Sequence, residues 1–215
     1  MSFDPSSDFS DVVDGVESVT LNRRGSTPHG TGESVQNALR RAVTVEEAAQ
    51  SNGKYTASDV TWHLPCSQLS SRPRLGDIIT DGDGQRWTVL EVHWATMKSR
   101  WQCAARNLAV VYALDDTVSV LKAVYAKGTA GAAEATWRTW RTGVRARIQP
   151  LESRPAVENA AETTDDRFTI FVEEDLPLDH SHRIKAADGM IYRITKVTGA
   201  ERIGELATIE VVGSG

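Results

Sequence analysis

The sequence predicts a mainly β protein with two tandem small barrels or sandwiches, and two observations carry that prediction. A hairpin pattern over residues 77–92 occurs again over residues 182–197, 105 residues later and without a gap. In each copy an Asp-Gly pair, which tolerates the positive φ of a tight turn, lies between two segments of alternating apolar residues. The rest of the chain contains further short alternating segments separated by polar loops, which is typical of barrels and sandwiches.

The repeat also predicts the domain organisation. Trp87 of the first copy aligns with Tyr192 of the second. The two aligned Asp-Gly pairs are the predicted hairpin turns: Asp83, Gly84, Asp188 and Gly189. A repeat of this length indicates two similar domains rather than a solenoid of short units. We expect a flexible N-terminal arm, a first barrel and, after a short linker, a second barrel that is an internal repeat of the first: residues 1–15, 16–114 and 115–215.

The first half contains four expected strand segments: 16–23, 60–65, the hairpin 77–92, and 101–105. Residues 33–51 are less clear, although Thr44 and Glu47 form a capping box for a short helix that Asn52-Gly53 ends. This helix has no counterpart in the second half. The apolar run 108–114 either extends the last strand or links the two domains.

The second half repeats the order of expected strands: 118–124, 137–149, 168–172, the hairpin 182–197, and 206–212. Residues 127–135 contain two glycines and are expected to form a loop, and residues 151–166 form a longer polar stretch. We therefore expect about five or six short strands in each half. Closure of each sheet would remove its exposed edges.

Composition places the chain among ordinary globular proteins. It has 215 residues, of which 40% are hydrophobic, and a net charge of −5. This balance argues against a general nucleic-acid-binding surface, which needs clustered Lys and Arg, but it suits a protein that DNA slides past. We expect no signal peptide and no membrane span, and a reducing cytosol in which Cys66 and Cys103 stay thiols.

No motif requires an enzyme. The Asp-Gly-Asp-Gly run 81–84 is interpreted as a turn, because an EF-hand loop needs further oxygen ligands and flanking helices. His180 and His182 are expected to form an exposed loop pair without a third metal ligand. His63 and His93 are expected to point outward from strands. Since nucleophile-elbow and phosphate-loop patterns are also absent, we predict no catalytic residue, no cofactor and no metal site.

Six tryptophans are many for this length, and core packing explains most of them. Trp94, Trp137 and Trp140 lie near expected loops and are candidate interface anchors. Arg138 and Arg141 alternate with the last two and join this candidate set. This basic stretch either binds nucleic acid, covers a solvated strand surface or meets an acidic neighbouring subunit.

Each half resembles the head–tail joining proteins of tailed bacteriophages, the small β-barrel connectors called stoppers or head-completion proteins. The residues that carry this resemblance are a strand ending at Pro, a second strand and a hairpin: 144–150, 168–172 and 183–194 in the second half, and 60–65 and 77–89 in the first. The resemblance covers most of each half. The chain departs from the family because it carries the domain twice, which puts the subunit stoichiometry in doubt.

The resemblance implies a structural role in the virion neck, for a protein made in the host cytoplasm. It implies a homo-oligomeric ring, either a hexamer or one templated on a dodecamer. The ring would bind the portal or adaptor on one side and the tail terminator or tail tube on the other, with packaged DNA passing through without sequence readout.

A loop of such a ring can close the DNA channel, and residues 151–166 or 66–75 are the candidates, unless both are plain surface loops. The candidate gating residues of the longer loop are mostly acidic: Glu152, Arg154, Glu158, Glu162, Asp165 and Asp166. Two alternative functions stay open. One is another tail component, such as a terminator or baseplate adaptor. The other is a tandem β-barrel module that binds sugar or nucleic acid.

Overall fold

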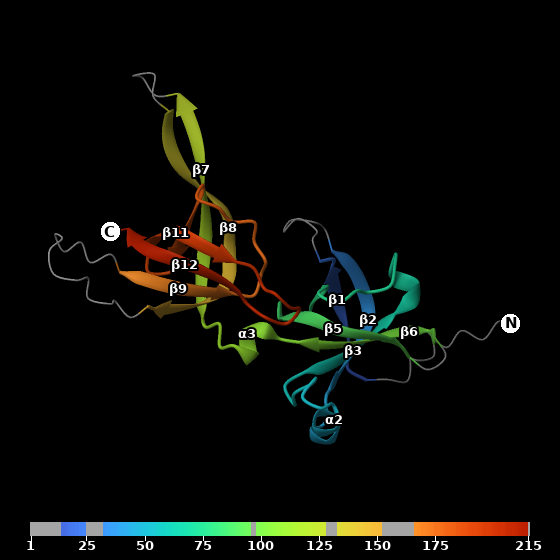
Figure 1. Cartoon of the computed structure of the whole chain (residues 1–215). Coiled ribbons are helices and arrows are strands. Elements are labelled where there is room, and N and C mark those ends of the chain that lie inside the picture. The colour runs from blue at the N-terminus through green and yellow to red at the C-terminus, as the bar shows by residue number, and fades with distance from the viewer. Residues whose placement is uncertain (1–13, 25–31, 96–97, 128–132, 152–165, 215) are drawn as a thin grey trace. The chain divides into compact units, whose positions relative to one another are not determined.

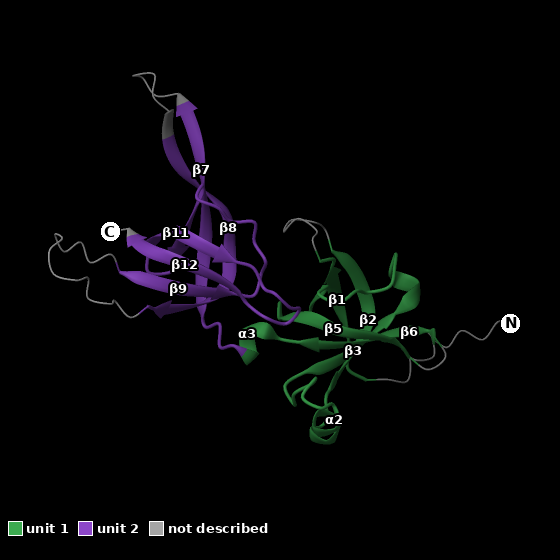
Figure 2. Ribbon diagram, viewed as in Figure 1, with its two compact units in different colours: residues 1–111 green, residues 112–215 purple. Residues whose placement is uncertain are grey.

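Alternating apolar residues fold this chain into closed β-barrels in the computed structural model, which describes residues 14–24, 32–95, 98–127, 133–151 and 166–214. The chain divides into two units, residues 1–111 and 112–215 (Figure 2). Each unit contains one closed barrel of six antiparallel strands. The predicted fold class, mainly β with two small barrels, is confirmed. Residues 1–13 of the expected N-terminal arm lie outside the described residues.

The first barrel has the strand order β1-β2-β3-β6-β5-β4 and closes between β4 and β1 (Figure 1). Its strands are β1 (Val16–Asn22), β2 (Glu33–Ala42), β3 (Val60–Pro65), β4 (Ile78–Thr80), β5 (Arg86–Trp94) and β6 (Arg100–Arg106). Short helical segments among the described residues accompany these strands: α2 (Val45–Gln50), η1 (Cys66–Gln68) and α3 (Leu108–Val111).

The second barrel has the order β7-β8-β9-β12-β11-β10 and closes between β10 and β7. Its strands are β7 (Asp116–Lys127), β8 (Ala133–Pro150), β9 (Arg167–Val172), β10 (His182–Ala186), β11 (Ile191–Thr198) and β12 (Ala207–Ser214). Strand for strand, this is the order of the first barrel. The two units therefore share one topology.

Each barrel encloses its own apolar core, because alternate residues of every strand point inward. The largest residues of the first core include Leu21, Trp62, Leu64 and Ile79, and those of the second include Ile170, Ile184 and Ile209. Trp62, Trp87 and Trp101 are buried in the first core, as expected for most of the tryptophans. Closure pairs the edge strands of each barrel with one another, which protects it from edge-to-edge aggregation.

The two repeated hairpins have the same backbone geometry. Ile79 pairs with Trp87 in the first, and Ile184 pairs with Tyr192 in the second. Each turn has a glycine with positive φ, +77° at Gly84 and +94° at Gly189. A shift of register also occurs at matching places, between residues 89 and 91 of β5 and between residues 194 and 196 of β11. The aligned sequences thus specify aligned turns and bulges.

The capping box forms as predicted. The Thr44 hydroxyl accepts the Glu47 N–H at 3.2 Å, and a Glu47 carboxylate oxygen accepts the Thr44 N–H at 2.8 Å. Helix α2 ends at Gln50, before Asn52 and Gly53 with their positive φ. The strand β2, by contrast, gave no clear pattern in the sequence. Its buried residues, Val35 and Ala38, are three apart rather than two, because Asn37 between them has a φ of +57° and shifts the register.

Two expectations about loops are settled by the strands. The run 108–114 begins with the helical turn α3 and does not extend β6, so of the two alternatives it links the units. The expected loop over residues 127–135 is too long at both ends, because β7 continues to Lys127 and β8 begins at Ala133. Residues 128–132 between them lie outside the described part.

Candidate functional site

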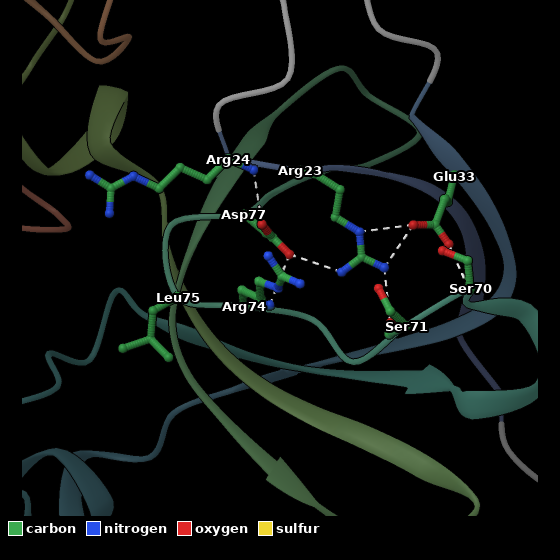
Figure 3. Close-up of a pocket in the computed structure, with 8 residues that line it drawn as sticks. All are labelled: Arg23, Arg24, Glu33, Ser70, Ser71, Arg74, Leu75 and Asp77. Carbon is green, nitrogen blue, oxygen red and sulfur yellow. Dashed lines mark hydrogen bonds and ion pairs between the residues drawn. The ribbon is translucent and has the colours of Figure 1, made fainter.

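A polar cavity of about 360 Å³ opens on the first barrel beside the end of β1 (Figure 3). Its lining comes from β1, β2 and the loop before β4: Arg23, Arg24, Glu33, Ser70, Ser71, Arg74, Leu75 and Asp77. This lining includes part of the loop 66–75, which was one of the two candidate gating loops. The contacts inside the cavity therefore bear on what that loop does.

Arg23 ties the loop to the barrel. Its guanidinium contacts Glu33 at 2.7 Å and Asp77 at 3.1 Å, and it donates to the carbonyls of Ser71 and Arg72 at 2.9 and 3.0 Å. We call Arg23, Glu33 and Asp77 the Arg23 cluster. The charges of this cluster are all paired within the barrel, so the geometry suits a structural clamp better than a ligand or catalytic site.

The two carboxylates of the Arg23 cluster also hold backbone N–H groups of the same loop. Asp77, which is buried, accepts the N–H of Arg24 at 2.9 Å and that of Arg74 at 2.8 Å. Glu33 accepts the Ser70 N–H at 2.7 Å. Partial burial tends to raise the pKa of Glu33, but the bonds from Ser70 and Arg23 outweigh it, and the pKa lies below its usual value.

The expectation that His180 and His182 form an exposed pair is wrong for His182. His180 is exposed, but His182 begins β10 and is buried, because it alternates with the inward-facing Ile184. The His182 Nδ1 lies 2.8 Å from the carboxylate of Asp179. Bonds from Ser181, and next the one from His182, lower the pKa of Asp179 to about 2. No group of three or more metal-binding side chains occurs in the described ranges.

The other two strand histidines differ from each other. His93 is exposed as expected and lies 2.8 Å from Glu91. His63 is only partly exposed, and burial, followed by the nearby charges of Arg41 and Arg100, lowers the pKa of its ring. A neutral, half-buried ring at this position is a packing residue and contacts no catalytic partner among the residues described.

The candidate interface residues fall in two places. Trp94 lies in the first barrel, 48% exposed, with its ring stacked on the buried Trp101 at a centroid distance of 3.6 Å. Trp137 and Arg138 lie together on β8 of the second barrel, where the guanidinium of Arg183 covers the Trp137 ring at 4.1 Å. The sequence grouped these residues as one set, and the structure divides them between the two units.

The side chains of Trp140 and Arg141 pack within the second barrel. The ring of Trp140 packs against the core and lies 5.3 Å from that of His182. Arg141 contacts Glu174 at 2.6 Å, and both side chains are largely buried. These contacts indicate that both residues stabilise the second barrel of a single chain. Of the basic pair, Arg138 is the exposed member.

The candidate gating residues divide between a segment outside the described part of the chain and Asp166, which precedes β9. Residues 152–165, which include Glu152, Arg154, Glu158, Glu162 and Asp165, lie outside the described residues. Asp166 is exposed, and its carbonyl accepts the N–H of Gly213 at 2.9 Å, which anchors the entry to β9 on β12.

The structure adds a feature that the sequence did not reveal. Residues 122–127 of β7 pair with residues 133–138 of β8 at the end of the barrel and beyond it, and we call this pair of segments the ribbon. In Figure 1 the ribbon rises clear of the other strands of its barrel. Tyr125 and Val124 on it are 66% and 39% exposed. The alternation of Val144, Ala146 and Ile148 in β8 was visible in the sequence, but it did not show where the barrel ends.

Fold and site together define a protein with two barrels and, in the described part, a structural clamp at the polar cavity. Residues 111–212 match the model of a protein family described as phage head completion protein. This match covers the second barrel, and the family is structural and non-enzymatic. No curated protein matches the chain. None of the described helices has the length and apolar character that crossing a membrane requires.

Proposed function

We propose that this chain is a structural protein of the neck of a tailed bacteriophage, where it joins the portal or adaptor of the filled head to the tail. The observation that carries the proposal is the match of residues 111–212 to the phage head completion family. The protein would act as a homo-oligomeric ring, with the tail terminator or tail tube on its other side. Its place in the virion would be the head–tail junction.

The first barrel enters this proposal as a diverged copy of the second. Its support is the shared strand order and the shared geometry of the two hairpins, down to the position of the register shift. The family model matches the chain once, over the second barrel. Divergence of the first copy would explain why the first barrel keeps the topology of the second while its sequence does not match the family model.

The ring would let DNA pass without reading its sequence. A net charge of −5 supports this, since a protein lining that attracted phosphates would slow the passage of DNA. A gating role for one loop is a further part of the proposal. The Arg23 cluster holds the loop 66–75 against the barrel, which favours 151–166 as the segment to test.

Deletion of the gene, with complementation from a plasmid, tests the proposal by negative-stain electron microscopy of the particles. We expect separate heads and finished tails, with heads that lose DNA, and joined infectious particles after complementation. Normal infectious particles from the deletion would refute the neck assignment. Tailed particles with a defective tail tip would instead support another tail component.

The gating part needs its own test. A chain in which residues 154–163 are replaced by a short Gly-Ser linker should still join heads to tails if the segment only gates. We then expect particles of normal shape that lose DNA on storage, measured as nuclease-sensitive DNA over time. Stable retention of DNA in such particles would remove the gate from the proposal and leave the joining role intact.

A further inference from the structure

The ribbon is longer than the second barrel needs. Six residue pairs, from Lys122 with Arg138 to Lys127 with Ala133, make up the ribbon, and the last four, from Val124 with Thr136 onward, lie past the last contact of β7 with β10. At about 3.4 Å per residue these four pairs give a two-stranded projection of about 14 Å. An isolated two-stranded hairpin is marginally stable in water, so a projection of this length calls for a partner that covers it.

Both edges of the ribbon are open. On one side β10 pairs with β7 only as far as Lys122, after which the Ala123 N–H donates to the Ser181 carbonyl. On the other side β9 first pairs with β8 at Ala146. Within the described ranges, residues 124–127 and 133–145 therefore have no strand beside their outer edge. Open edges are sites at which another chain adds a strand or docks.

The register shows which backbone groups face outward. Opposed residues in an antiparallel pair alternate between those that exchange hydrogen bonds and those whose N–H and C=O point away. Because the Ala123 N–H points toward Ser181, Ala123 and its partner Trp137 belong to the second kind, and so do Tyr125 and Ala135. Ala135 and Trp137 thus present their N–H and C=O groups along the free edge of β8.

The charge of the ribbon points to an acidic partner. Lys122 and Arg138 lie directly opposite each other, and both are exposed. Like charges in opposed positions repel, so this face gains when a carboxylate lies against it. Exposed carboxylates are available elsewhere on the second barrel, in the loops before β10 and before β12, on Asp175, Glu201 and Glu205. The loop before β12 lies at the end of β7 opposite the ribbon, because the Gly204 carbonyl accepts a hydrogen bond from the hydroxyl of Tyr112, which precedes β7.

We propose that the ribbon of one copy docks on the next copy of this chain, with Lys122 and Arg138 against its exposed carboxylates. The proposal rests on the ring of the proposed function. Basic and acidic surfaces on one barrel are complementary between copies, and a head-to-tail contact of this kind forms a ring when the rotation from copy to copy closes. DNA suits the ribbon less well, because open strand edges and the exposed Val124 and Tyr125 fit a protein surface.

The size of the ribbon sets the strength of the contact. A ribbon of about 20 by 10 Å offers roughly 400 Å² when both faces are covered. A stable pair of proteins buries about 800 Å² on each partner. One ribbon contact is therefore weak by itself, and the copies hold together when every copy gives and receives one ribbon in a closed ring.

Photo-crosslinking inside assembled particles tests the contact directly. A photoreactive amino acid replaces Thr136, which is exposed on the ribbon face that carries Arg138, in a mixture of tagged and untagged chains. We expect tagged–untagged dimers after irradiation, with crosslinked peptides from residues 173–178 or 199–206. The same probe at Thr195, exposed on β11, should give at most one tenth of that dimer yield.

The outcomes separate the two proposals. Crosslinks from Thr136 only to another virion protein or to DNA would overturn the docking of the ribbon while leaving the neck assignment in place. A chain that is absent from purified particles would refute the proposed function itself. Equal dimer yields from Thr136 and Thr195 would also overturn the docking, because the contact would not be specific to the ribbon.

Charge reversal provides a second test. The double variant Lys122→Glu and Arg138→Glu should reduce the yield of joined particles at least tenfold. Adding Asp175→Lys, Glu201→Lys and Glu205→Lys to the same chain should restore at least part of that yield, since both surfaces are then reversed. Failure of the combined variant to restore any yield, although it is folded, would contradict the proposed pairing.

A matched control reverses the same number of charges elsewhere on the second barrel. Lys185→Glu with Arg193→Glu changes two exposed residues of β10 and β11 and should leave the particle yield within twofold of the unmodified chain. An equal loss in this control would attribute the effect to net charge and overturn the proposal. All variants are compared by thermal melting, so that a folding defect is recognised.

Discussion

The carboxylate of Asp81 accepts a hydrogen bond from the indole Nε1 of Trp87 at 2.9 Å, in the buried end of the first barrel. The same oxygen accepts a bond from Arg40 at 3.0 Å, and the other oxygen accepts the N–H groups of Asp83 and Gln85. Asp81 thus joins a hairpin turn, a core tryptophan and the strand β2, which is not adjacent to this hairpin in the barrel. The second hairpin has an alanine, Ala186, at the aligned position.

Replacing Asp81 with Ala should lower the free energy of unfolding by about 3 kcal/mol. The change leaves a buried indole N–H and two turn N–H groups without their acceptor, and removes a carboxylate from Arg40. Urea unfolding measures the loss. Asp188→Ala is the control, because its exposed carboxylate accepts one bond, from the Met190 N–H, and should cost about 1 kcal/mol. Equal losses for the two variants would contradict the central position of Asp81.

The glycines of the two hairpin turns should respond alike to substitution. Gly84→Ala and Gly189→Ala each place a Cβ on a backbone with φ near +80 to +90°, and each should cost about 1–2 kcal/mol. A Cβ at either position meets no neighbour within 4 Å, so the cost is conformational. Gly82→Ala is the matched control, with open space and no positive φ, and should be nearly neutral in chemical denaturation. A neutral effect at Gly84 would refute the assigned turn geometry.

Removal of Arg23 should free the loop before β4. Arg23→Met breaks the pairs with the buried Asp77 and with Glu33 and should destabilise the first barrel by about 3 kcal/mol. Hydrogen exchange at residues 70–74 should become at least tenfold faster. Arg24→Met is the control, because the Arg24 bond to Asp77 comes from its backbone N–H and is retained. Unchanged exchange in Arg23→Met would show that the cluster does not hold the loop.

The two thiols should differ in reactivity. Burial raises the pKa of Cys103 to about 12, and burial also raises that of the less buried Cys66. Thiolate is the reactive form, so at pH 8 iodoacetamide should modify Cys66 slowly and Cys103 only after unfolding, as mass spectrometry of the peptides can show. Modification of Cys103 in the folded protein at the rate of Cys66 would contradict its buried position.

The same shift gives a dependence on alkaline pH. Because the folded pKa of Cys103 lies above the unfolded value of about 9, its contribution to stability is complete below pH 9 and is lost as the pH rises toward 12. Cys103→Ala should therefore flatten the decline of stability above pH 9, relative to its own value at pH 7. The same decline in both proteins would assign the effect to other groups.

The parts of the fold that the sequence predicted are those in which local chemistry and the burial pattern agree. Asp-Gly turns between alternating residues specified both hairpins, and Thr44 with Glu47 specified the start of α2. The strand β2 was obscured because the bulge at Asn37 changes the spacing of its buried residues. The alternation shows which residues face inward, but it does not mark where β7 and β8 leave the barrel.

The candidate site was harder to predict than the fold. The partners of Arg23 come from three segments that are adjacent only in the folded chain, so no spacing in the sequence indicates the cluster. His182 was assigned to a polar loop because its neighbours are polar, although its alternation with Ile184 places it inside. Beyond Ala123 the described β7 residues of the ribbon are exposed, and only the register and the open edges reveal the ribbon.

Locating the chain in the virion tests the central claim most directly. An epitope tag at the C-terminus, with gold-labelled antibody and electron microscopy of purified complementing particles, reports the position. The account predicts label at the junction between head and tail, on particles that remain infectious. Label at the tail tip or along the head surface would contradict the neck assignment. The assignment would also be contradicted if the tagged chain restored infectivity and were detected unassembled, while the particles carried no label.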